Sequence, residues 1–232
     1  IMKTLGILGG VGPQTTSKVY LSIIDAIRKS NKDTYPAIII YNLPFPFVIE
    51  NEAIVQGRNS EKMIPYLIDG AKVLEKAGAD FWILPCNTLH KYINDIRESV
   101  GIPFLSMLDE TVTHLKSLKT KTVGVLATKS TIDSNIYKDL LEENGINVLY
   151  PIDAEQEHIN NIIVELISGE NSNSHCQQIE AICNSLAKKG ADTILLACTD
   201  LQLGMSNVQS PIPVVDTTEI LIQASVRELT SV

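Results

Sequence analysis

The sequence of 232 residues is long enough for one large domain or two small ones. Hydrophobic residues make up 44% and charged residues 20%, a balance that excludes a disordered or fibrous chain. The formal net charge of −8 disfavours nucleic acid as a partner, because binding to phosphates requires clustered lysine and arginine.

The sequence also bears on where the protein is expected to work. Apolar runs such as Ala37–Ile40 and Ile194–Ala197 are far below the roughly 18 residues that a membrane span requires, so no membrane partner is expected. The N-terminus leads directly into a strand and a glycine turn and shows no secretion signal, and Ile1 before Met2 is expected to be extraneous. The four cysteines are too few and too irregular for a disulfide framework, which favours a reducing, cytoplasmic compartment.

Short β-rich segments alternate with stretches of helical periodicity, and this pattern predicts an α/β fold with parallel sheets. The predicted strands are Thr4–Leu8, Ala37–Leu43, Asp80–Leu84, Phe104–Met107, Thr122–Ala127, Asn147–Tyr150, Thr193–Ala197 and Val214–Val215. The predicted helices include Val19–Ile27, Ile64–Leu74, Thr131–Asn144, Glu155–Ser168, His175–Lys189 and Thr217–Leu229. Three of them are followed by glycines typical of helix ends, which are Gly145, Gly169 and Gly190.

The sequence repeats itself weakly. Lys3–Leu8 corresponds to Lys121–Leu126, and the segment that contains Cys86 corresponds to the segment that contains Cys198. The offset between the two cysteines is 112 residues. This duplication predicts two related halves, residues 1–102 with 213–232 and residues 103–212. Because open α/β sheets bind ligands beyond the carboxyl ends of their strands, we expect a cleft between the halves.

Two cysteines occupy matched positions in the repeat. Cys86 follows the apolar run Phe81–Leu84 and precedes Asn87, so its sulfur is expected at a strand-to-helix junction, where amides favour a thiolate. An isolated cysteine in such a place is more often a small buried hydrophobe. Cys198 occupies the equivalent position in the other half, again closely followed by a threonine. We therefore predict that Cys86 and Cys198 are chemically active.

The other two cysteines are predicted to be structural. Cys176 and Cys183 lie seven residues apart on one predicted helix, and neither follows a buried strand. The sequence contains no H-E-x-x-H motif, EF-hand loop or Cys/His cluster, so no metal site is predicted.

Two turns could bind an anion through backbone amides or hydroxyls. Gly9–Pro13 is glycine-rich and lies between a predicted strand and a helix. It lacks the G-x-G-x-x-G pattern and the lysine of a P-loop, and the alternative is a tight packing turn. Thr128, Ser130 and Thr131 form a hydroxyl-rich turn in the second half, where the alternative is a helix N-cap.

Two further residues lie close to the cysteines in sequence. His90 is four residues after Cys86, where it is either an acid–base partner or a solvated helix residue. Asp200 is two residues after Cys198, where it either binds a substrate amine or, as is more frequent, caps the next helix.

Three motifs together resemble the aspartate/glutamate racemase family, and the aspartate racemase branch most of all. They are Gly6–Pro13, Pro85–His90 and Ala197–Leu201. The resemblance extends over essentially the whole chain. This sequence has Val11 where that branch usually has methionine, and Asp200 where it usually has glutamate.

The resemblance implies a cofactor-independent amino-acid racemase that acts on a small-molecule substrate, commonly as a homodimer. Its fold would consist of two pseudo-symmetric lobes, each a parallel sheet flanked by helices, with the active site in the cleft between them. Cys86 and Cys198 would act on opposite faces of the α-carbon, one as a thiolate base and the other as a thiol acid. The implied substrate-binding residues are Gly10, Val11, Gly12, Asn87, Thr88, Thr128, Thr131, Thr199 and Asp200.

The sequence departs from the family where cations are expected. Aspartate racemases commonly carry Pro-Asp-Arg after the second strand, but Asn42–Glu50 contains no arginine. A second family cation, usually a lysine, is also missing around Asp153–Asn160, where His158 is nearest. Arg58 or Lys129 would have to supply the counter-charge for an aspartate or glutamate side chain.

Two alternative functions remain open. A related enzyme of the hydantoin racemase, maleate isomerase or arylmalonate decarboxylase type would suit a substrate with fewer negative charges. A noncatalytic sensor of an acidic metabolite is the alternative from another class. The presence of both cysteines argues against the sensor, because binding alone does not require two opposed thiols.

Overall fold

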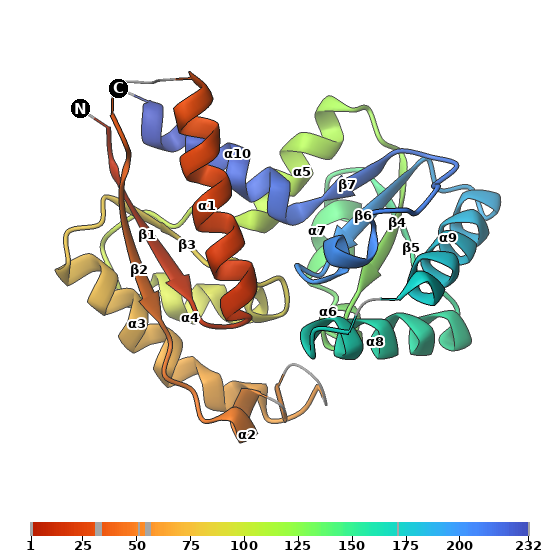
Figure 1. Ribbon diagram of the computed structural model, residues 1–232, viewed down its shortest axis with the longest axis horizontal. Helices are drawn as coiled ribbons and strands as arrows, with labels where there is room; N and C mark the ends of the chain where they lie inside the picture. The colour runs from red at the N-terminus through yellow and green to blue at the C-terminus, as the bar shows by residue number, and fades with distance from the viewer. Residues whose placement is uncertain (1, 31–33, 51, 54–56, 171, 232) are drawn as a thin grey trace. The chain divides into compact units, whose positions relative to one another are not determined.

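The computed structural model describes residues 2–30, 34–50, 52–53, 57–170 and 172–231, so Ile1 lies outside it (Figure 1). The chain divides into two units, residues 1–110 with 218–232 and residues 111–217. The repeat predicted boundaries near residues 102 and 213, and each structural boundary lies a few residues further along. The first lies later because Met107, which begins α5 (Met107–Ser117), packs in the core of the first unit. The second lies later because β7 (Val214–Asp216) pairs with the sheet of the second unit.

The first unit is built on a parallel sheet with the strand order β2-β1-β3. These strands are β1 (Thr4–Gly9), β2 (Ala37–Asn42) and β3 (Phe81–Ile83), and the sequence predicted all three. Leu5 pairs with Ile38 on one side and with Phe81 on the other, so β1 is the central strand. In a parallel sheet the carboxyl ends of the strands lie at the same edge.

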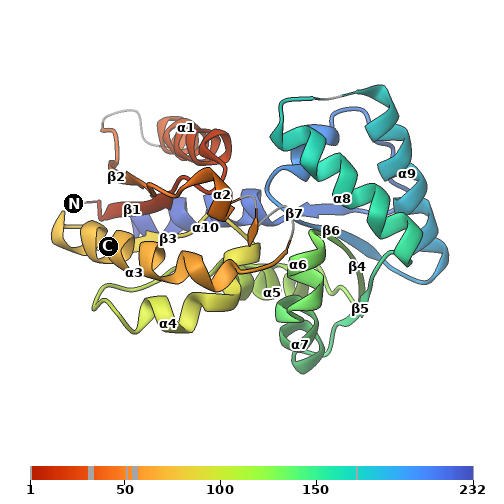
Figure 2. The same cartoon turned by 90° about the horizontal axis from the view of Figure 1, so that it is seen from below.

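The side chains of β1 alternate between two helical layers, as the pleat of a strand requires. Leu5 and Ile7 pack against α1 (Pro13–Ser30) and α10 (Thr217–Thr230). Leu8 packs in the other cluster, with α3 (Ile64–Lys76) and α4 (Ile93–Arg97). Figure 2 shows α1 on one face of this sheet and α3 with α4 on the other. The remaining short elements of the unit are α2 (Phe47–Glu50) and the 3-10 helices η2 (Ser60–Met63) and η3 (Thr88–Tyr92).

The predicted strand Phe104–Met107 is wrong. Only Phe104 pairs in the manner of a strand, in an isolated parallel bridge with Trp82, and Met107 already begins α5. The hydroxyl of Ser106 accepts a hydrogen bond from the Asp109 backbone N–H at 3.2 Å. Such a bond satisfies a free donor at a helix start, so the chain turns into a helix directly after the bridge.

The second unit contains a parallel sheet with the strand order β5-β4-β6-β7. Helices α8 (Asp153–Ile167) and α9 (Asn173–Lys188) cover one face, and α7 (Ile136–Glu143) lies on the other (Figure 2). The strands that precede β7 are β4 (Thr122–Ala127), β5 (Asn147–Leu149) and β6 (Thr193–Ala197). The predicted fold class, an α/β fold with two parallel sheets flanked by helices, is therefore confirmed.

The predicted helix Thr131–Asn144 is also wrong, because it is two helices. Helix α6 (Lys129–Asp133) ends before Asn135, which adopts the left-handed conformation with φ 54°, and α7 follows. Asparagine tolerates this conformation better than most residues, yet its presence does not reveal a break in an otherwise periodic segment. The predicted glycine helix ends are confirmed, with positive φ at Gly145, Gly169 and Gly190.

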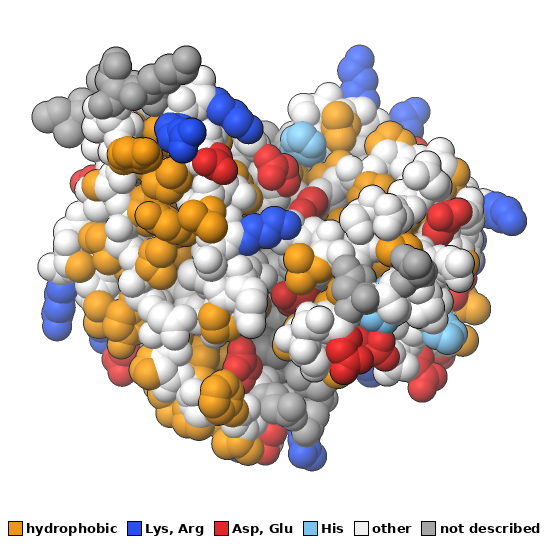
Figure 3. Space-filling model, in the orientation of Figure 1, with side chains coloured by type: hydrophobic (Ala, Val, Ile, Leu, Met, Phe, Trp, Pro, Cys, Tyr) orange, Lys and Arg blue, Asp and Glu red, His pale blue; other side chains and the backbone are white. Residues whose placement is uncertain are grey.

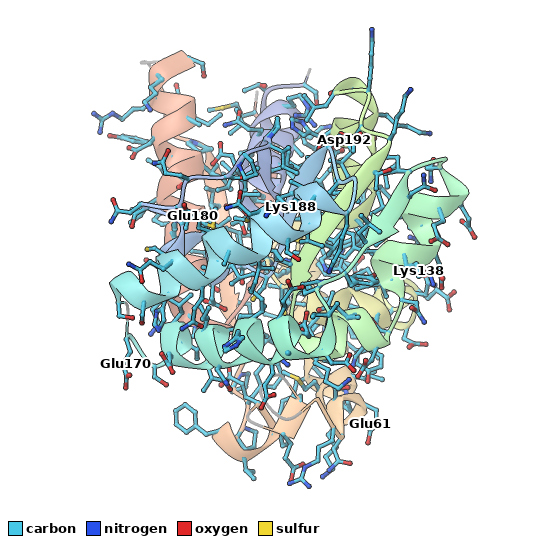
Figure 4. The ribbon with its side chains drawn as sticks, turned by 90° about the vertical axis from the view of Figure 1, so that its right-hand side faces the viewer. Glu61, Lys138, Glu170, Glu180, Lys188 and Asp192 are labelled. Carbon is cyan, nitrogen blue, oxygen red and sulfur yellow. The ribbon has the colours of Figure 1, made fainter. Side chains whose placement is uncertain are left out.

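Equivalent hydrogen bonds begin the central strand in both units. The Asp80 backbone N–H donates to the Thr4 carbonyl at 2.8 Å, and the Asp192 N–H donates to the Thr122 carbonyl at the same distance. Each aspartate carboxylate accepts a return bond, from Thr4 N–H at 2.6 Å and from Thr122 N–H at 3.2 Å. Asp192, labelled in Figure 4, thus lies at the start of β6, opposite the end that leads to Cys198. The repeat in the sequence is therefore also a repeat in structure.

Among the described residues, no helix is long and apolar enough to pass through a lipid bilayer.

Gly10 provides a test of the packing at the carboxyl end of β1. It has φ 99°, and a Cβ atom there would lie 2.7 Å from the Leu43 backbone nitrogen. We expect Gly10→Ala to lower the free energy of unfolding by about 2–4 kcal/mol, through backbone strain and overpacking together. Gly78→Ala is the matched control, since Gly78 has φ 90° and nothing within 4 Å of its Cβ position, and it should cost about 1 kcal/mol. Equal losses in urea unfolding would contradict this assignment.

Candidate active site

Cys86 lies in a tight turn just beyond the carboxyl end of β3. Its backbone N–H donates to the Leu84 carbonyl at 2.8 Å, which closes a three-residue turn around Pro85. The 3-10 helix η3 begins two residues later, and the Cys86 side chain is 7% exposed. The predicted strand-to-helix junction is therefore present, with a 3-10 helix in place of an α-helix.

Cys198 directly follows β6, whose five residues are all buried. Its side chain is 6% exposed, and its carbonyl accepts the Leu201 N–H at 3.3 Å, where the 3-10 helix η4 (Leu201–Gly204) begins. Each unit thus carries one buried cysteine between the end of a buried strand and a 3-10 helix.

The predicted binding residues gather at the strand ends of their own units. Asn87 and Thr88 follow Cys86 and are almost fully buried. The glycine turn follows β1, which pairs directly with β3. In the second unit Ala127 pairs with Ala197, so Thr128 and Cys198 follow neighbouring strands at the same edge. Thr131 and Thr199 are also buried at this edge.

In two groups of predicted binding residues, the hydrogen bonds match the structural role that the sequence analysis gave as the alternative to anion binding. The Thr128 hydroxyl caps α6 by accepting the Thr131 backbone N–H at 3.1 Å, and the two hydroxyls lie 3.0 Å apart. The Gly10 N–H donates to the Thr16 hydroxyl at 3.1 Å, so this amide already serves the packing of the turn. Val11 is buried, and Gly12 is partly exposed with φ 76°.

Asp200 occupies the N-cap position of η4, but its side chain makes no capping hydrogen bond there. Helix capping, the more frequent role for such an aspartate, is therefore not the role that the structure shows. Thr199 contributes through its carbonyl, which accepts the Gln202 side-chain amide at 2.8 Å and holds this turn.

His90 is buried rather than solvated, which excludes one of its two predicted roles. The ring lies 5.5 Å from the Phe104 ring, and Nδ1 is 2.7 Å from the Cys86 carbonyl. Because a carbonyl only accepts, Nδ1 must carry the hydrogen. Burial lowers the pKa of His90 to about 4, against the opposing effects of the Cys86 carbonyl and Asp109. At neutral pH the ring is therefore neutral and supports the Cys86 turn.

The cations considered as counter-charges lie on the surface of their units. Arg58 is exposed, and Lys129 is exposed and paired with Asp133 at 3.0 Å. His158, on α8, is also exposed. Lys91 was not among the predicted site residues; it is partly buried on η3, and burial lowers its pKa, while Cys86 and Glu61 act in the opposite direction. In the sequence, its position five residues after Cys86 places it near the candidate site, but a lysine in a short helix is usually solvent-exposed.

The two cysteines predicted to be structural, Cys176 and Cys183, are buried residues of α9. Burial raises the pKa of the Cys183 thiol to about 11, which keeps it protonated and unreactive. The Cys176 thiol donates to the Gly204 carbonyl at 3.3 Å. Across the described part of the chain, no group of three or more His, Cys, Asp or Glu residues could hold a metal ion.

This fold, with a buried cysteine after equivalent strands of two related units, is matched by a known family. Residues 8–225 match the family described as Asp/Glu/Hydantoin racemase, and the chain belongs to this family. One relative is the broad specificity amino-acid racemase RacX of Bacillus subtilis, which is 34% identical over 229 residues, with 96% of each chain covered.

Two solved structures are similar over nearly the whole chain. An aspartate racemase homologue from Pyrococcus horikoshii is 31% identical with a TM-score of 0.81, covering 98% of this chain and 99% of that one. The aspartate racemase of Picrophilus torridus is 28% identical with a TM-score of 0.77, covering 97% of this chain and 93% of the other.

The buried neutral His90 predicts a specific dependence of stability on pH. Its pKa is lower in the folded than in the unfolded chain, so the unfolded state gains a proton first as the pH falls. Between about pH 6.5 and pH 4 this group should remove about 3 kcal/mol from the free energy of unfolding. His90→Asn keeps a donor for the Cys86 carbonyl but cannot titrate, so its urea-unfolding free energy should fall less over this range. Parallel pH curves for the two proteins would exclude this role.

Proposed function

We propose that this protein is a cofactor-independent amino-acid racemase in which Cys86 and Cys198 are the two acid–base groups. The observation that carries the proposal is the pair of matched turns, each with a buried cysteine after an equivalent strand of its unit. Membership of the racemase family supports the reaction class.

The proposed reaction exchanges one proton for another at the α-carbon. One cysteine, as thiolate, forms an S–H bond with the α-proton, and the electron pair of the broken C–H bond moves into the adjacent carboxylate. The other cysteine, as thiol, then gives its proton to the opposite face, so that its S–H bond breaks and a new C–H bond forms. The product is the other enantiomer, and the protonation states of the two thiols are exchanged.

The intermediate carries extra negative charge on the substrate carboxylate, and that charge must be stabilised by donors. We assign this role to Asn87 and Thr88 in the first unit and to Thr128, Thr131 and Thr199 in the second. The glycine turn, with Gly10, Val11 and Gly12, and Asp200 complete the proposed set; Asp200, as a carboxylate, suits the substrate amine. Because the Gly10 amide already donates to Thr16, Gly10 would contribute through the backbone shape of the turn.

The proposed substrates are not limited to aspartate and glutamate but include other amino acids. The segment after β2 contains no arginine, and Arg58 and Lys129 are exposed. A buried side-chain carboxylate without a cationic partner would cost several kcal/mol by order of magnitude. The relative RacX is described as having broad specificity. A panel of amino acids, assayed for D/L interconversion without pyridoxal phosphate and with a chelator present, tests this proposal directly.

The two cysteines can be tested separately in heavy water. Cys86→Ser and Cys198→Ser should each reduce racemisation by about a thousandfold or more, because a serine hydroxyl is too weak an acid for this role. Each variant keeps one thiol, which can still exchange the α-hydrogen of a single enantiomer with retention, and the two variants should select opposite enantiomers.

Cys176→Ser is the matched control, since a hydroxyl can still donate to the Gly204 carbonyl, and its racemisation rate should match the parent. Exchange of the same enantiomer by both active-site variants, or parental racemisation in either, would refute the two-base assignment.

We also propose that the protein is a homodimer. Apolar side chains gather over the part of the first unit that α1 and β2 occupy (Figure 3). Leu21 is 55%, Tyr35 63% and Ile40 42% exposed, and among the described strands β2 is at the edge of its sheet, next to β1 alone. Natural proteins rarely leave such an edge open. Light scattering at micromolar concentration should give twice the mass of the chain, and a monomer would contradict the proposal.

A further inference from the structure

The central strands of the two units differ in how their last residues are held. β1 pairs with β2 along its whole length, and the carbonyl of its last residue, Gly9, accepts the Leu43 backbone N–H at 2.9 Å. β4 has the same length, and its last residue is Ala127. It pairs with β5 only as far as Gly124. On this side the end of β4 therefore needs a donor from outside the described strands.

A side chain of α8 supplies that donor. The Gln156 Nε2 donates to the Ala127 carbonyl at 2.9 Å and to the Asn160 Oδ1 at 3.0 Å. Because a carbonyl only accepts, the contact with Ala127 fixes the orientation of the Gln156 amide, and both hydrogens of its Nε2 are used. Gln156 and Asn160 are four residues apart on α8, so they lie on the same face of the helix.

Asn160 holds the chain on the other side of Thr128. Its Oδ1 accepts the Lys129 backbone N–H at 3.1 Å. Lys129 is the first residue of α6, and the first amides of a helix find no acceptor within the helix itself. The Thr131 N–H, two residues later, donates to the Thr128 hydroxyl. The residues before and after Thr128 are therefore bonded to one pair of side chains on α8.

This double contact determines where the Thr128 hydroxyl lies. The Ala127 carbonyl and the Lys129 amide belong to the two peptide planes that flank Thr128, so fixing both of them fixes its φ and ψ. Thr128 has φ −64° and ψ 152°, the extended conformation of a residue that caps a helix. Threonine has few χ1 rotamers, so its hydroxyl is placed once the backbone is set.

We propose that Gln156 and Asn160 are positioning residues for substrate binding, which hold Thr128 so that its hydroxyl meets the substrate carboxylate. This inference deepens the proposed function and rests on it, because it requires the carboxylate-binding role that we assign to Thr128. Both residues act through Thr128 and do not themselves bind the substrate. If they only stabilised the fold, their removal would reduce the amount of folded protein and leave substrate affinity unchanged.

Hydrogen exchange of the Lys129 amide, followed by NMR, tests the contact itself. In Asn160→Leu this amide loses its acceptor and should exchange about fivefold faster, the change that corresponds to one hydrogen bond. Asn160→Asp keeps an oxygen at the same position and should keep the parental rate. Asn161→Leu is the matched control, because Asn161 is the next residue of α8 and is exposed. Parental exchange in Asn160→Leu would overturn the inference.

Racemisation kinetics test the role in binding. For the amino acid that the parent converts fastest, Asn160→Leu and Gln156→Met should each raise KM by about fivefold, and Asn161→Leu should leave it unchanged. A loss of stability alone lowers the amount of active protein, which reduces the apparent kcat and leaves KM at the parental value. An unchanged KM in both variants would exclude a positioning role.

A double-mutant cycle shows whether Asn160 acts through Thr128. Thr128→Val removes the hydroxyl but keeps the shape of the side chain, so no hydroxyl is left to position. Asn160→Leu should lower kcat/KM by about fivefold in the parent and leave it unchanged in the Thr128→Val background. If the two effects multiply instead, Asn160 acts independently of the Thr128 hydroxyl and the inference is wrong.

The outcomes separate this inference from the proposed function. A parent protein that racemises nothing on the amino-acid panel would overturn the proposed function, and the positioning role with it, whatever the exchange rates. A parent protein that racemises amino acids, with the parental KM retained in Asn160→Leu and Gln156→Met, would overturn the positioning role alone.

Discussion

Parallel pairing of one central strand in each unit is the constraint on which the rest of the structure depends. β1 pairs with β2 and β3, and β4 pairs with β5 and β6, so each is bonded on both sides. Asp80 and Asp192 fix the register at one end through bonds to the first residues of these strands. With that end fixed, the turns that contain Cys86 and Cys198 follow at the other end, beside the glycine and threonine turns.

The two units share a backbone plan but differ in the chemistry around their cysteines. In the first unit, buried His90 donates to the Cys86 carbonyl, and Lys91 follows it on the same 3-10 helix. In the second, the Gln202 amide holds the neighbouring Thr199 carbonyl, with no change of charge. Duplication thus preserves the support of the turn, while the charged positions have diverged.

Hydrophobic patterning and turn residues were enough to predict most strands, the helix ends at Gly145, Gly169 and Gly190, and the matched cysteine turns. The errors lie where a single contact decides the conformation. The Ser106 hydroxyl begins a helix where a strand was expected, and left-handed Asn135 breaks a helix without disturbing its apolar period. The burial of His90 depends on Phe104, which is distant in sequence, so no local pattern reveals it.

The order in which the chain passes through the two units has a consequence for synthesis on the ribosome. The first unit is completed by α10, whose Leu221, Ile222 and Leu229 lie in its core, while the second unit is one continuous segment. The Lys3 backbone N–H, just before β1, donates to the carbonyl of Leu229, which follows the whole second unit in the sequence. Domains generally fold as units during translation. The second unit can therefore fold before the segment that completes the first unit has been made.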